Sequence, residues 1–482
     1  MATSTHLENL NKKTLLSQIL IPLTWILCFA NVVTLIYYFS DFPTWTYKDL
    51  FKVNGFSILI WTVVTFFSSV VQMYASNYMK GFKKKPKFLI LCLAFSLFVM
   101  LFVIANNIIL MVSFWLFMGL IMARLIGIDS EWKEAQEAAK FARYNYLGGT
   151  FFLAVAVGIL AYSTGSYTVE GILVNLEIIP YWMTILAALC IIVAAIIQSA
   201  IFPFHRWLLS AMTSPTPASA LMHAGFVNGA GILLTIFAPL LFSANVLLLI
   251  FIIGGVTAII AQFSKLLQVN VKQKLACSTI AQMSFMVMQC GLGFFTAAIT
   301  HLILHGFYKA YLFLSAGEGI QNALPKKPEN MVIKPLQTIV ILIAAILGGV
   351  LFGFITGKGV TFDSGLFLTF IVAITVGQVV YNVLNQQALS IAQKAIMTPI
   401  LIVVGIALYA VVFNGVTILM NDMPMSHIAV PLTITHIVFG FVFLVAFYIM
   451  LSGKYRTIPW LYIKLMNITQ PVSKTIVSFK SK

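Results

Sequence analysis

Three protonatable side chains recur at four-residue spacing within an otherwise apolar stretch. His301, His305 and Lys309 lie at i, i+4 and i+8. An α-helix turns by about 100° per residue, so this spacing places all three on one narrow face. Imidazole takes up and releases protons near neutral pH, and the lysine amine adds a third protonatable nitrogen. The row is therefore predicted to relay protons. The alternative is two histidines bonded to neighbouring backbone and a lysine whose amine reaches towards the membrane surface.

A second candidate feature is the proline-rich segment 202–223. Pro203, Pro215 and Pro217 each remove a backbone donor and interrupt a helix. Interrupted helices at membrane depth occur where they are buried in protein or line a wet cavity, as in ion carriers. A simple helix-turn-helix at the membrane surface is an alternative. His223, just after the prolines, is a packed core residue if it stands alone, or a link from the broken helix to the row.

Two further residues are weaker candidates for the ends of a proton path. Glu318 lies at the end of the span that holds the row, and it is predicted to connect the row to the cell interior. Lys358 follows a glycine-rich run and is predicted to connect the path to the outside. The alternatives are a solvated helix cap for Glu318 and an ordinary loop for Lys358.

The composition decides which kind of protein must position these residues. Hydrophobic residues make up 61% of the 482 residues and charged residues only 9%, against about 45–50% and about 25% in soluble proteins. An aqueous enzyme or a nucleic-acid-binding protein is therefore excluded, and the solvent must be lipid. Continuous apolar runs predict an all-α, polytopic membrane bundle with broken helices. We expect one integral membrane domain over 1–482 that ends in a cytoplasmic tail at 452–482.

Apolar stretches between polar breaks number about fourteen, and each is long enough to cross roughly 30 Å of hydrocarbon as a helix. No cleavable signal is expected, because the first stretch is full length and lacks a small-residue cleavage site. The predicted spans are 15–39, 54–79, 88–105, 107–127, 143–163, 181–204, 218–240, 243–264, 275–293, 295–317, 336–357, 364–385, 397–420 and 428–451.

The distribution of basic residues supports this topology. With fourteen spans, 25 of the 29 Lys and Arg residues fall on one side, three fall on the other and Lys309 falls inside a span. Basic residues concentrate on the cytoplasmic side of membrane proteins. The formal net charge of +16 is thus explained by topology, without nucleic acid. A multi-pass protein of the cell (inner) membrane with both termini in the cytoplasm is predicted.

Motifs of enzymes and metal sites are missing from the sequence. The five cysteines form no Cys-x-x-Cys pair or Cys/His cluster, so neither a disulfide framework nor a zinc site is predicted. No nucleotide-binding glycine loop, zinc-protease motif or nucleophile elbow is present. We therefore expect a transport subunit rather than an enzyme, with no cofactor in this chain.

Several motifs, in order along the chain, resemble those of the antiporter-like membrane subunits of complex I and of multisubunit cation/proton antiporters. The motifs are Gln72–Met79, Ser214-Pro-Thr-Pro-Ala-Ser-Ala-Leu-Met-His223, Gln268–Gln282 and His301–Lys309. The resemblance covers about 54–385. It implies an antiporter-like subunit fold and an ion path through His223, His301, His305 and Lys309.

Three positions depart from that family's pattern. The family places a Glu after Phe-Trp in an early helix, and this chain has Leu116 there. The family places a Lys five residues before the proline of the broken helix, and this chain has Gln198. Asn270 stands where the family has an acidic residue. The first Glu/Lys pair is therefore missing, so the resemblance does not imply two complete channels.

The closer resemblance is to the DabB family, the membrane subunits of DAB-type inorganic carbon transporters. It is carried by Phe204–Met212 and Ser214–Gly231. The resemblance implies a cytoplasmic partner of the DabA type, similar to a β-carbonic anhydrase and holding the zinc. It also implies that a flux of protons or Na+ through this chain drives hydration of CO2 to bicarbonate.

Other functions remain open from the sequence. The main alternative is a subunit of a multisubunit cation/proton antiporter or of a complex I or hydrogenase-type membrane arm. A subunit that reacts with quinone is a third possibility, although the chain shows no redox ligand set. A non-conducting scaffold would leave His301, His305 and Lys309 unexplained.

Overall fold

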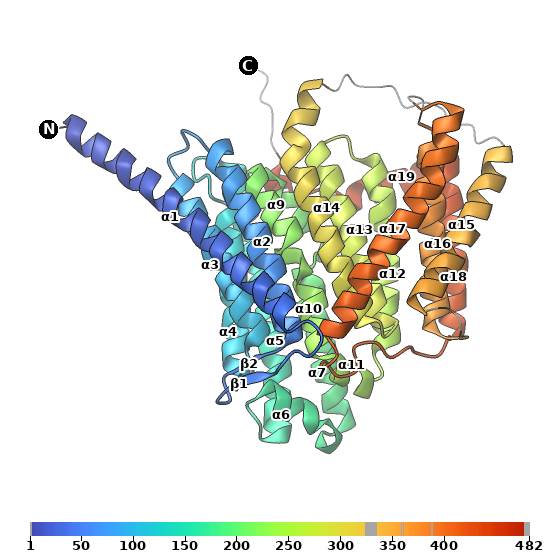
Figure 1. Cartoon of the computed structure of the whole chain (residues 1–482), viewed down its shortest axis with the longest axis horizontal. Helices are drawn as coiled ribbons and strands as arrows, with labels where there is room; N and C mark the ends of the chain where they lie inside the picture. Colours follow the sequence, from blue (N-terminus) through green and yellow to red (C-terminus); the bar gives the residue numbers. More distant parts are fainter. Residues whose placement is uncertain (1, 323–334, 358, 360, 387–388, 477–482) are drawn as a thin grey trace.

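The computed structural model describes residues 2–476, apart from 323–334, 358, 360 and 387–388. The side chains of 2–17, 317–322, 335–336, 451 and 454 also lie outside the description. The prediction of a polytopic helical bundle is confirmed, since thirteen long helices and one broken helix make up most of the described chain (Figure 1). Among the described residues, eleven helices are long and apolar enough to cross a membrane.

The long helices follow the predicted spans closely. They are α1 (Ala2–Tyr37), α2 (Gly55–Tyr78), α3 (Lys85–Ile104), α4 (Ile108–Ile126), α5 (Lys133–Thr164), α7 (Tyr181–Gln198), α12 (Leu247–Leu267), α13 (Val271–Gly291), α14 (Phe295–Asn322), α15 (Pro335–Thr356), α16 (Ser364–Leu384), α17 (Ile391–Leu419) and α18 (Ile434–Ser452).

Shorter elements connect these helices. They are β1 (Trp45–Tyr47), β2 (Phe51–Val53), α6 (Val169–Val174), η1 (Leu176–Ile178), α8 (Arg206–Ser210), η2 (Ala211–Thr213), α9 (Thr216–Ala224), η3 (Phe226–Asn228), α10 (Gly229–Ile236), α11 (Ala238–Ser243), η4 (Lys454–Arg456), α19 (Pro459–Ile468) and η5 (Ser473–Thr475). The broken helix consists of α9, η3 and α10.

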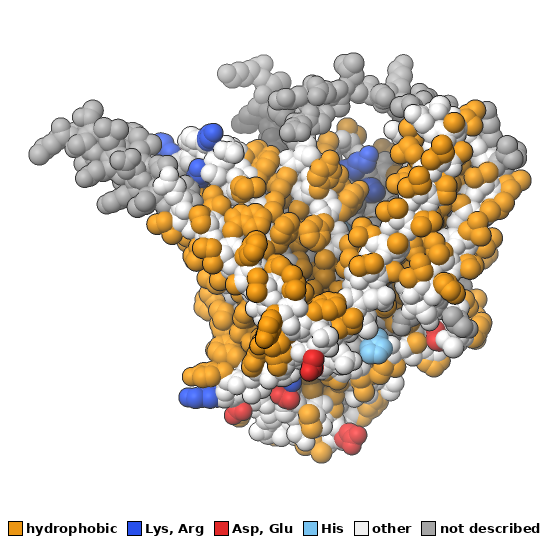
Figure 2. All heavy atoms as spheres, viewed as in Figure 1, with side chains coloured by type: hydrophobic (Ala, Val, Ile, Leu, Met, Phe, Trp, Pro, Cys, Tyr) orange, Lys and Arg blue, Asp and Glu red, His pale blue; other side chains and the backbone are white. Residues whose placement is uncertain are grey.

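The two ends of the bundle differ in their connections. The antiparallel β1–β2 hairpin, in which Trp45 pairs with Val53, marks one end, here named the hairpin end. The opposite end holds the turns 79–84 and 268–270 with their flanking lysines, and is named the lysine-rich end. The first turns of α1 lie at the lysine-rich end (Figure 1). On the visible face, apolar side chains cover the middle, and acidic side chains gather near the hairpin end (Figure 2).

Helix starts are set by residues whose side chains bond the first free N–H groups. Asn54 caps α2, Asn107 caps α4, Asn270 caps α13 and Asp363 caps α16, each accepting from backbone N–H groups of the first turn. Such caps satisfy donors that no helical carbonyl can reach. Asn270 thus has a local structural role at the position where the resembled family has an acidic residue.

The hydrophobic core has two main parts. The larger part is built from α2–α14, and the smaller part lies between the α12–α14 group and α15–α18. The diagonal helix α17 crosses in front of α14 and α12 (Figure 1). Helices α12 and α13 approach closely at Gly291. A Cβ on this residue would lie 2.3 Å from the backbone nitrogen of Phe251.

An extended segment at the hairpin end ties these helices together. Residues 420–433, here named the strap, run from α17 to α18 (Figure 1). The Asn54 side chain at the start of α2 donates to Met423 Sδ over 3.5 Å. The backbone N–H of Thr296 donates to Ser426 O over 3.0 Å, and that of Ser364 donates to Val430 O over 2.9 Å. The strap therefore joins the hairpin-end tips of α2, α14 and α16.

Candidate functional site

The predicted row lies on one face of the continuous helix α14. The His301 and His305 rings are nearly parallel, with centroids 6.0 Å apart and 12° between their planes. His305 is 5% exposed and Lys309 is 0% exposed. His301 lies nearest the hairpin end and Lys309 nearest the lysine-rich end, so the three groups run along the helix through the protein interior.

Lys309 is held by backbone and not by a carboxylate. Its Nζ donates to Leu275 O over 3.0 Å, within the first turns of α13. In the described part of the chain the only ion pair is Lys52–Glu170, near the hairpin end. A buried ionisable side chain without an ionic partner is unusual, and within a membrane helix it is a candidate functional residue. Proton transfer from Lys309 would not require a salt bridge to break.

His223 is brought beside the row by the broken helix. It lies at the end of α9, is 0% exposed, and stacks on Phe313 of α14 with centroids 4.4 Å apart and 16° between the planes. Its charge would interact with those of Lys309 and His305. Among the described residues, neither ring nitrogen of His223 has a hydrogen-bond partner. Buried polar atoms are normally paired, so both nitrogens remain free to bond a mobile proton carrier.

The chain breaks twice around His223. The break at the prolines is confirmed: α8 and η2 separate α7 from α9, and Lys272 Nζ donates to Ser214 O over 2.7 Å. The second break, η3, was not predicted from the sequence and directly follows α9. There, Gln198 Nε2 donates to Phe226 O over 3.5 Å and the Ser199 hydroxyl donates to Val227 O. Only the nearby glycines signal this break.

The residues at the first Glu/Lys pair of the resembled family are neutral. Trp115 is 1% exposed and Gln198 is 2% exposed, while Leu116 is half-buried. A Cβ on Gly229 would lie 2.9 Å from Gln198 Cγ and 3.5 Å from the Trp115 ring. This part of the bundle is tightly packed. The Gln198 amide donates a hydrogen bond to Phe226 O in the second break of the helix.

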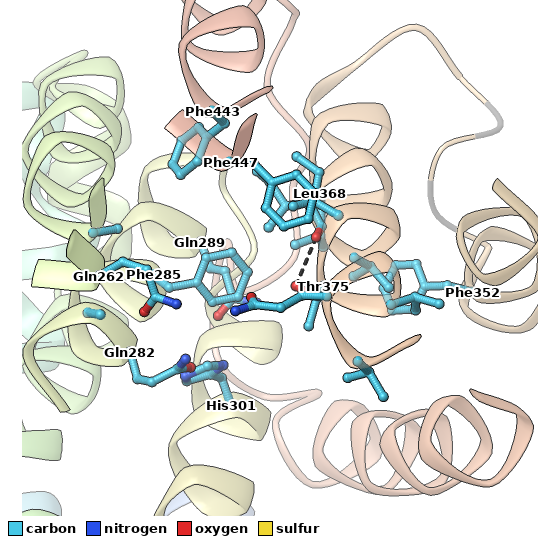
Figure 3. Close-up of a pocket in the computed structure, with 18 of the residues that line it drawn as sticks. Gln262, Gln282, Phe285, Gln289, His301, Phe352, Leu368, Thr375, Phe443 and Phe447 are labelled. Carbon is cyan, nitrogen blue, oxygen red and sulfur yellow. Dashed lines mark hydrogen bonds between the residues drawn. The ribbon is translucent and has the colours of Figure 1, made fainter. Parts of the chain in front are cut away.

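A cavity of about 440 Å³ lies between α12–α14 and α15–α18. His301 lines it together with glutamine side chains of α12, α13 and α16. Figure 3 shows His301 beside Gln282, with Gln289 further along the cavity. Sequence reasoning missed this cavity because its lining comes from seven helices. The amides, scattered over distant parts of the chain, form no motif.

The two predicted ends of the path lie largely outside the description. Glu318 belongs to the last turns of α14, but its side chain is not among those described. Lys358 lies outside the described residues altogether. Their roles at the inside and the outside therefore stay predictions. Within the described residues, His, Cys, Asp and Glu side chains form no group of three able to hold a metal ion.

Two family models match the chain. The model described as "NADH:quinone oxidoreductase/Mrp antiporter, TM" matches residues 105–372. The model described as "NADH-Ubiquinone oxidoreductase (complex I), chain 5 N-terminus" matches residues 49–89.

Curated relatives carry names of two kinds. A probable inorganic carbon transporter subunit DabB of Bacillus anthracis is 39% identical over 255 residues, which are 52% of this chain and 49% of that protein. A DabB1 subunit of Halothiobacillus neapolitanus is 33% identical, over 62% of this chain and 55% of that protein. NADH-quinone oxidoreductase subunit L of Escherichia coli is 34% identical, over 58% of this chain and 48% of that protein. The chain spans about half the length of the curated relatives it matches.

Solved structures share the fold. The Mrp complex from Dietzia sp. DQ12-45-1b matches with a TM-score of 0.57 and 20% identity, over 95% of this chain and 51% of that one. An archaeal membrane-bound sulfane sulfur reductase matches with a TM-score of 0.57 and 19% identity, over 95% of this chain and 93% of that one. With the family model matching more than half of its residues, the chain belongs to the NADH:quinone oxidoreductase/Mrp antiporter family of transmembrane subunits.

Proposed function

We propose that this chain is the proton-conducting membrane subunit of an energy-coupled inorganic carbon pump for CO2 and bicarbonate. Its ion flux would be coupled to a carbonic-anhydrase-like partner on the cytoplasmic side. The relatives named DabB support the transport of inorganic carbon. The observation that carries the proposal is the row of half-buried His301 and buried His305 and Lys309, which has no carboxylate partner among the described residues.

The row acts by passing protons between neighbouring nitrogens. A neutral imidazole can accept a proton on one nitrogen and release another from its second nitrogen. In our proposal protons enter at His301, pass through His305 and reach Lys309, with His223 as a branch from the broken helix. Glu318 is proposed to connect the row to the cytoplasm and Lys358 to connect the path to the outside.

The lysine-rich end is proposed to face the cytoplasm, where basic residues concentrate. Lys309 lies nearest that end, close to the break that separates α8 from α9. A change of charge at Lys309 would act on α13 and on the broken helix, and through them on a docked partner. In this proposal the partner, of the DabA type, carries the zinc and hydrates CO2. This chain conducts the ion flux, and the flux drives the reaction in the partner.

Replacing Lys309 by Ala tests the function. We expect bicarbonate uptake and CO2-dependent growth to fall by about 100-fold or more, as on removal of an essential proton-transfer group. The matched control is Lys394→Ala, because Lys394 Nζ also donates to a backbone carbonyl, that of Leu384, over 2.7 Å. Lys394 belongs to the first turn of α17 and not to the row on α14, so this variant should keep its uptake.

Normal uptake in a Lys309→Ala variant expressed at the ordinary level would overturn the proposal. Sodium extrusion in exchange for protons, without carbon uptake, would instead identify a cation/proton antiporter subunit.

A further inference from the structure

Three lysines lie together at the lysine-rich end of α12–α14, and they are here named the lysine group. Lys265 belongs to the last turn of α12 and Lys274 to the first turn of α13, while Lys309 lies on α14. The charge of Lys265 interacts with those of Lys274 and Lys309. Lys274 is exposed, Lys265 is half-buried and Lys309 is fully buried. The lysine group therefore extends from the protein surface to the row.

The lysine group has no acidic partner among the described residues, where the single ion pair joins Lys52 and Glu170 near the hairpin end. Lys309 Nζ donates to Leu275 O, whereas Lys265 makes no hydrogen bond with any described residue. Like charges repel one another, and partial burial reduces the screening of this repulsion by dissolved ions. A bound anion would offset the repulsion and would give Lys265 a partner.

A buried amide adds a neutral hydrogen-bond donor near Lys265. Gln268 follows Lys265 by three residues, at the end of α12, so the two side chains leave the helix on the same side. The Nε2 atom of Gln268 is buried and has no hydrogen-bond partner among the described residues. Buried amide donors are normally paired. Helix α13 begins at Val271, and the N-terminus of a helix carries a partial positive charge. The ligand that suits these donors is therefore a negatively charged acceptor.

These donors fit an oxyanion better than a halide ion. An oxyanion distributes its charge over several oxygens, which can accept from ammonium and amide groups at the same time. Bicarbonate also has one O–H group, and the Oε1 atom of Gln268 can accept its hydrogen bond. The lysine group contains no arginine, whose planar guanidinium is the side chain best matched to phosphate oxygens. The side chains therefore favour bicarbonate over a phosphate group.

We propose that Lys265, Lys274 and Gln268 form a binding site for an oxyanion, and that this oxyanion is the bicarbonate formed by the partner. This inference rests on the proposed function, which places the lysine-rich end at the cytoplasm and the production of bicarbonate beside it. A bicarbonate ion at Lys265 would also interact with the charge of Lys309. Binding of bicarbonate and protonation of the row would therefore affect each other reciprocally.

Binding is tested by thermal unfolding of the full chain in detergent, at about pH 8, where exposed lysines stay charged. Sodium bicarbonate is compared with sodium chloride at equal ionic strength. A ligand that binds only the folded state raises the unfolding temperature, and we expect bicarbonate to raise it by about 2 °C more than chloride as the site saturates. Lys265→Gln should abolish this difference, and Lys274→Gln should reduce it.

Two control variants separate the site from a general effect of charge. Lys265→Arg keeps the positive charge and should keep most of the difference between bicarbonate and chloride. Lys87→Gln removes an exposed lysine of α3 at the same end of the bundle and should keep all of it. Equal unfolding temperatures in the two salts, or a bicarbonate effect that persists in Lys265→Gln, would overturn the site.

Further arms of the experiment identify the anion. A larger effect of sodium phosphate, or of phosphatidylglycerol added to the micelles, that is lost in Lys265→Gln would identify a phosphate site and overturn the assignment to bicarbonate. The measurement does not involve transport, so its failure is distinct from a failure of the proposed function. Normal carbon uptake in Lys309→Ala together with a bicarbonate effect that requires Lys265 would overturn the proposed function and support the anion site.

Discussion

Two regions of the bundle differ in their buried polar residues and in the space beside them. Around α4 and α7, the residues at the family's first Glu/Lys pair are neutral and packed against the broken helix. Around α13 and α14, the buried His305 and Lys309 and the half-buried His301 form a row that ends at a cavity of about 440 Å³. A proton path needs both titratable groups and polar space. In the α13–α14 region, the titratable His301 lines a cavity that also carries glutamine side chains.

The sharpest way to break this comparison is to remove the middle member of the row. His305→Gln keeps a side chain of similar size that can form hydrogen bonds but does not titrate near neutral pH. Because each step passes through a neighbouring nitrogen, we expect carbon uptake and proton flux to fall by about 100-fold. Flux in sealed vesicles is the measurement, with Gln198→Leu as the control in the packed region. Flux retained by His305→Gln would mean that the row is structural.

Substitutions in the packed α4–α7 region also test the comparison. Leu116→Glu combined with Gln198→Lys restores the family's pair within the α4–α7 region. We expect no recovery of flux when this pair is added to Lys309→Ala, because the broken helix packs tightly against Gln198 and Trp115. Burying the new charges should lower the free energy of unfolding by about 3 kcal/mol or more, measured by thermal unfolding in detergent. Recovered flux would show that the packed region can still conduct.

Close packing of backbones distinguishes the two regions as well. In Gly291→Ala, the new Cβ would lie 2.3 Å from Phe251 N and 2.7 Å from its Cα. Backbone atoms cannot relieve the overlap by a change of rotamer, so we expect a loss of about 2 kcal/mol in the free energy of unfolding. Gly148→Ala in α5 is the matched control, because a Cβ there meets nothing within 4 Å. Equal unfolding temperatures for the two variants would contradict this account of the α12–α13 contact.

The smallest expected effect concerns the junction between the packed region and the C-terminal segment. His205, 6% exposed and outside the spans, bonds Ile468 O over 2.7 Å. Burial lowers the pKa of His205 below its usual 6.5; the carbonyl of Ile468 opposes this shift and Arg206 adds to it. Because the folded state favours the neutral ring, its stabilising contribution is complete above about pH 6.5 and is lost as the pH falls further.

Unfolding temperatures at about pH 7.5 and about pH 5.5 check this effect. The parent chain should lose about 2 °C more than His205→Gln over this interval. An identical decrease in both proteins would show that His205 does not contribute to the pH dependence.

Local patterns in the sequence were sufficient for the row and for most helices. The spacing of His301, His305 and Lys309 alone places them on one face, and the prolines alone predict the first break. The predicted span 181–204 is too long, because α7 ends at Gln198 and the apolar residues that follow lie in a buried connection. Hydrophobicity does not distinguish a buried loop from a helix.

The remaining features depend on contacts between distant segments. The break at η3 is stabilised by Gln198 and Ser199 of another helix, and glycines in a membrane helix indicate close packing as readily as a break. The cavity is likewise lined from α12 to α18. Neither feature has a local pattern from which it could be predicted.

The strap has a mechanical consequence for the coupling proposed above, in which a change in the bundle acts on a partner at the lysine-rich end. It fixes the hairpin-end tips of α2, α14 and α16 to one segment through backbone hydrogen bonds and one side-chain contact. If α15–α18 tilt against α12–α14, the strap keeps their hairpin-end tips in place. The tilt is therefore a rotation about an axis at the hairpin end. The displacement grows with distance from this axis and is greatest at the lysine-rich end. A small change in the width of the cavity is thereby converted into the largest movement on the opposite face of the bundle.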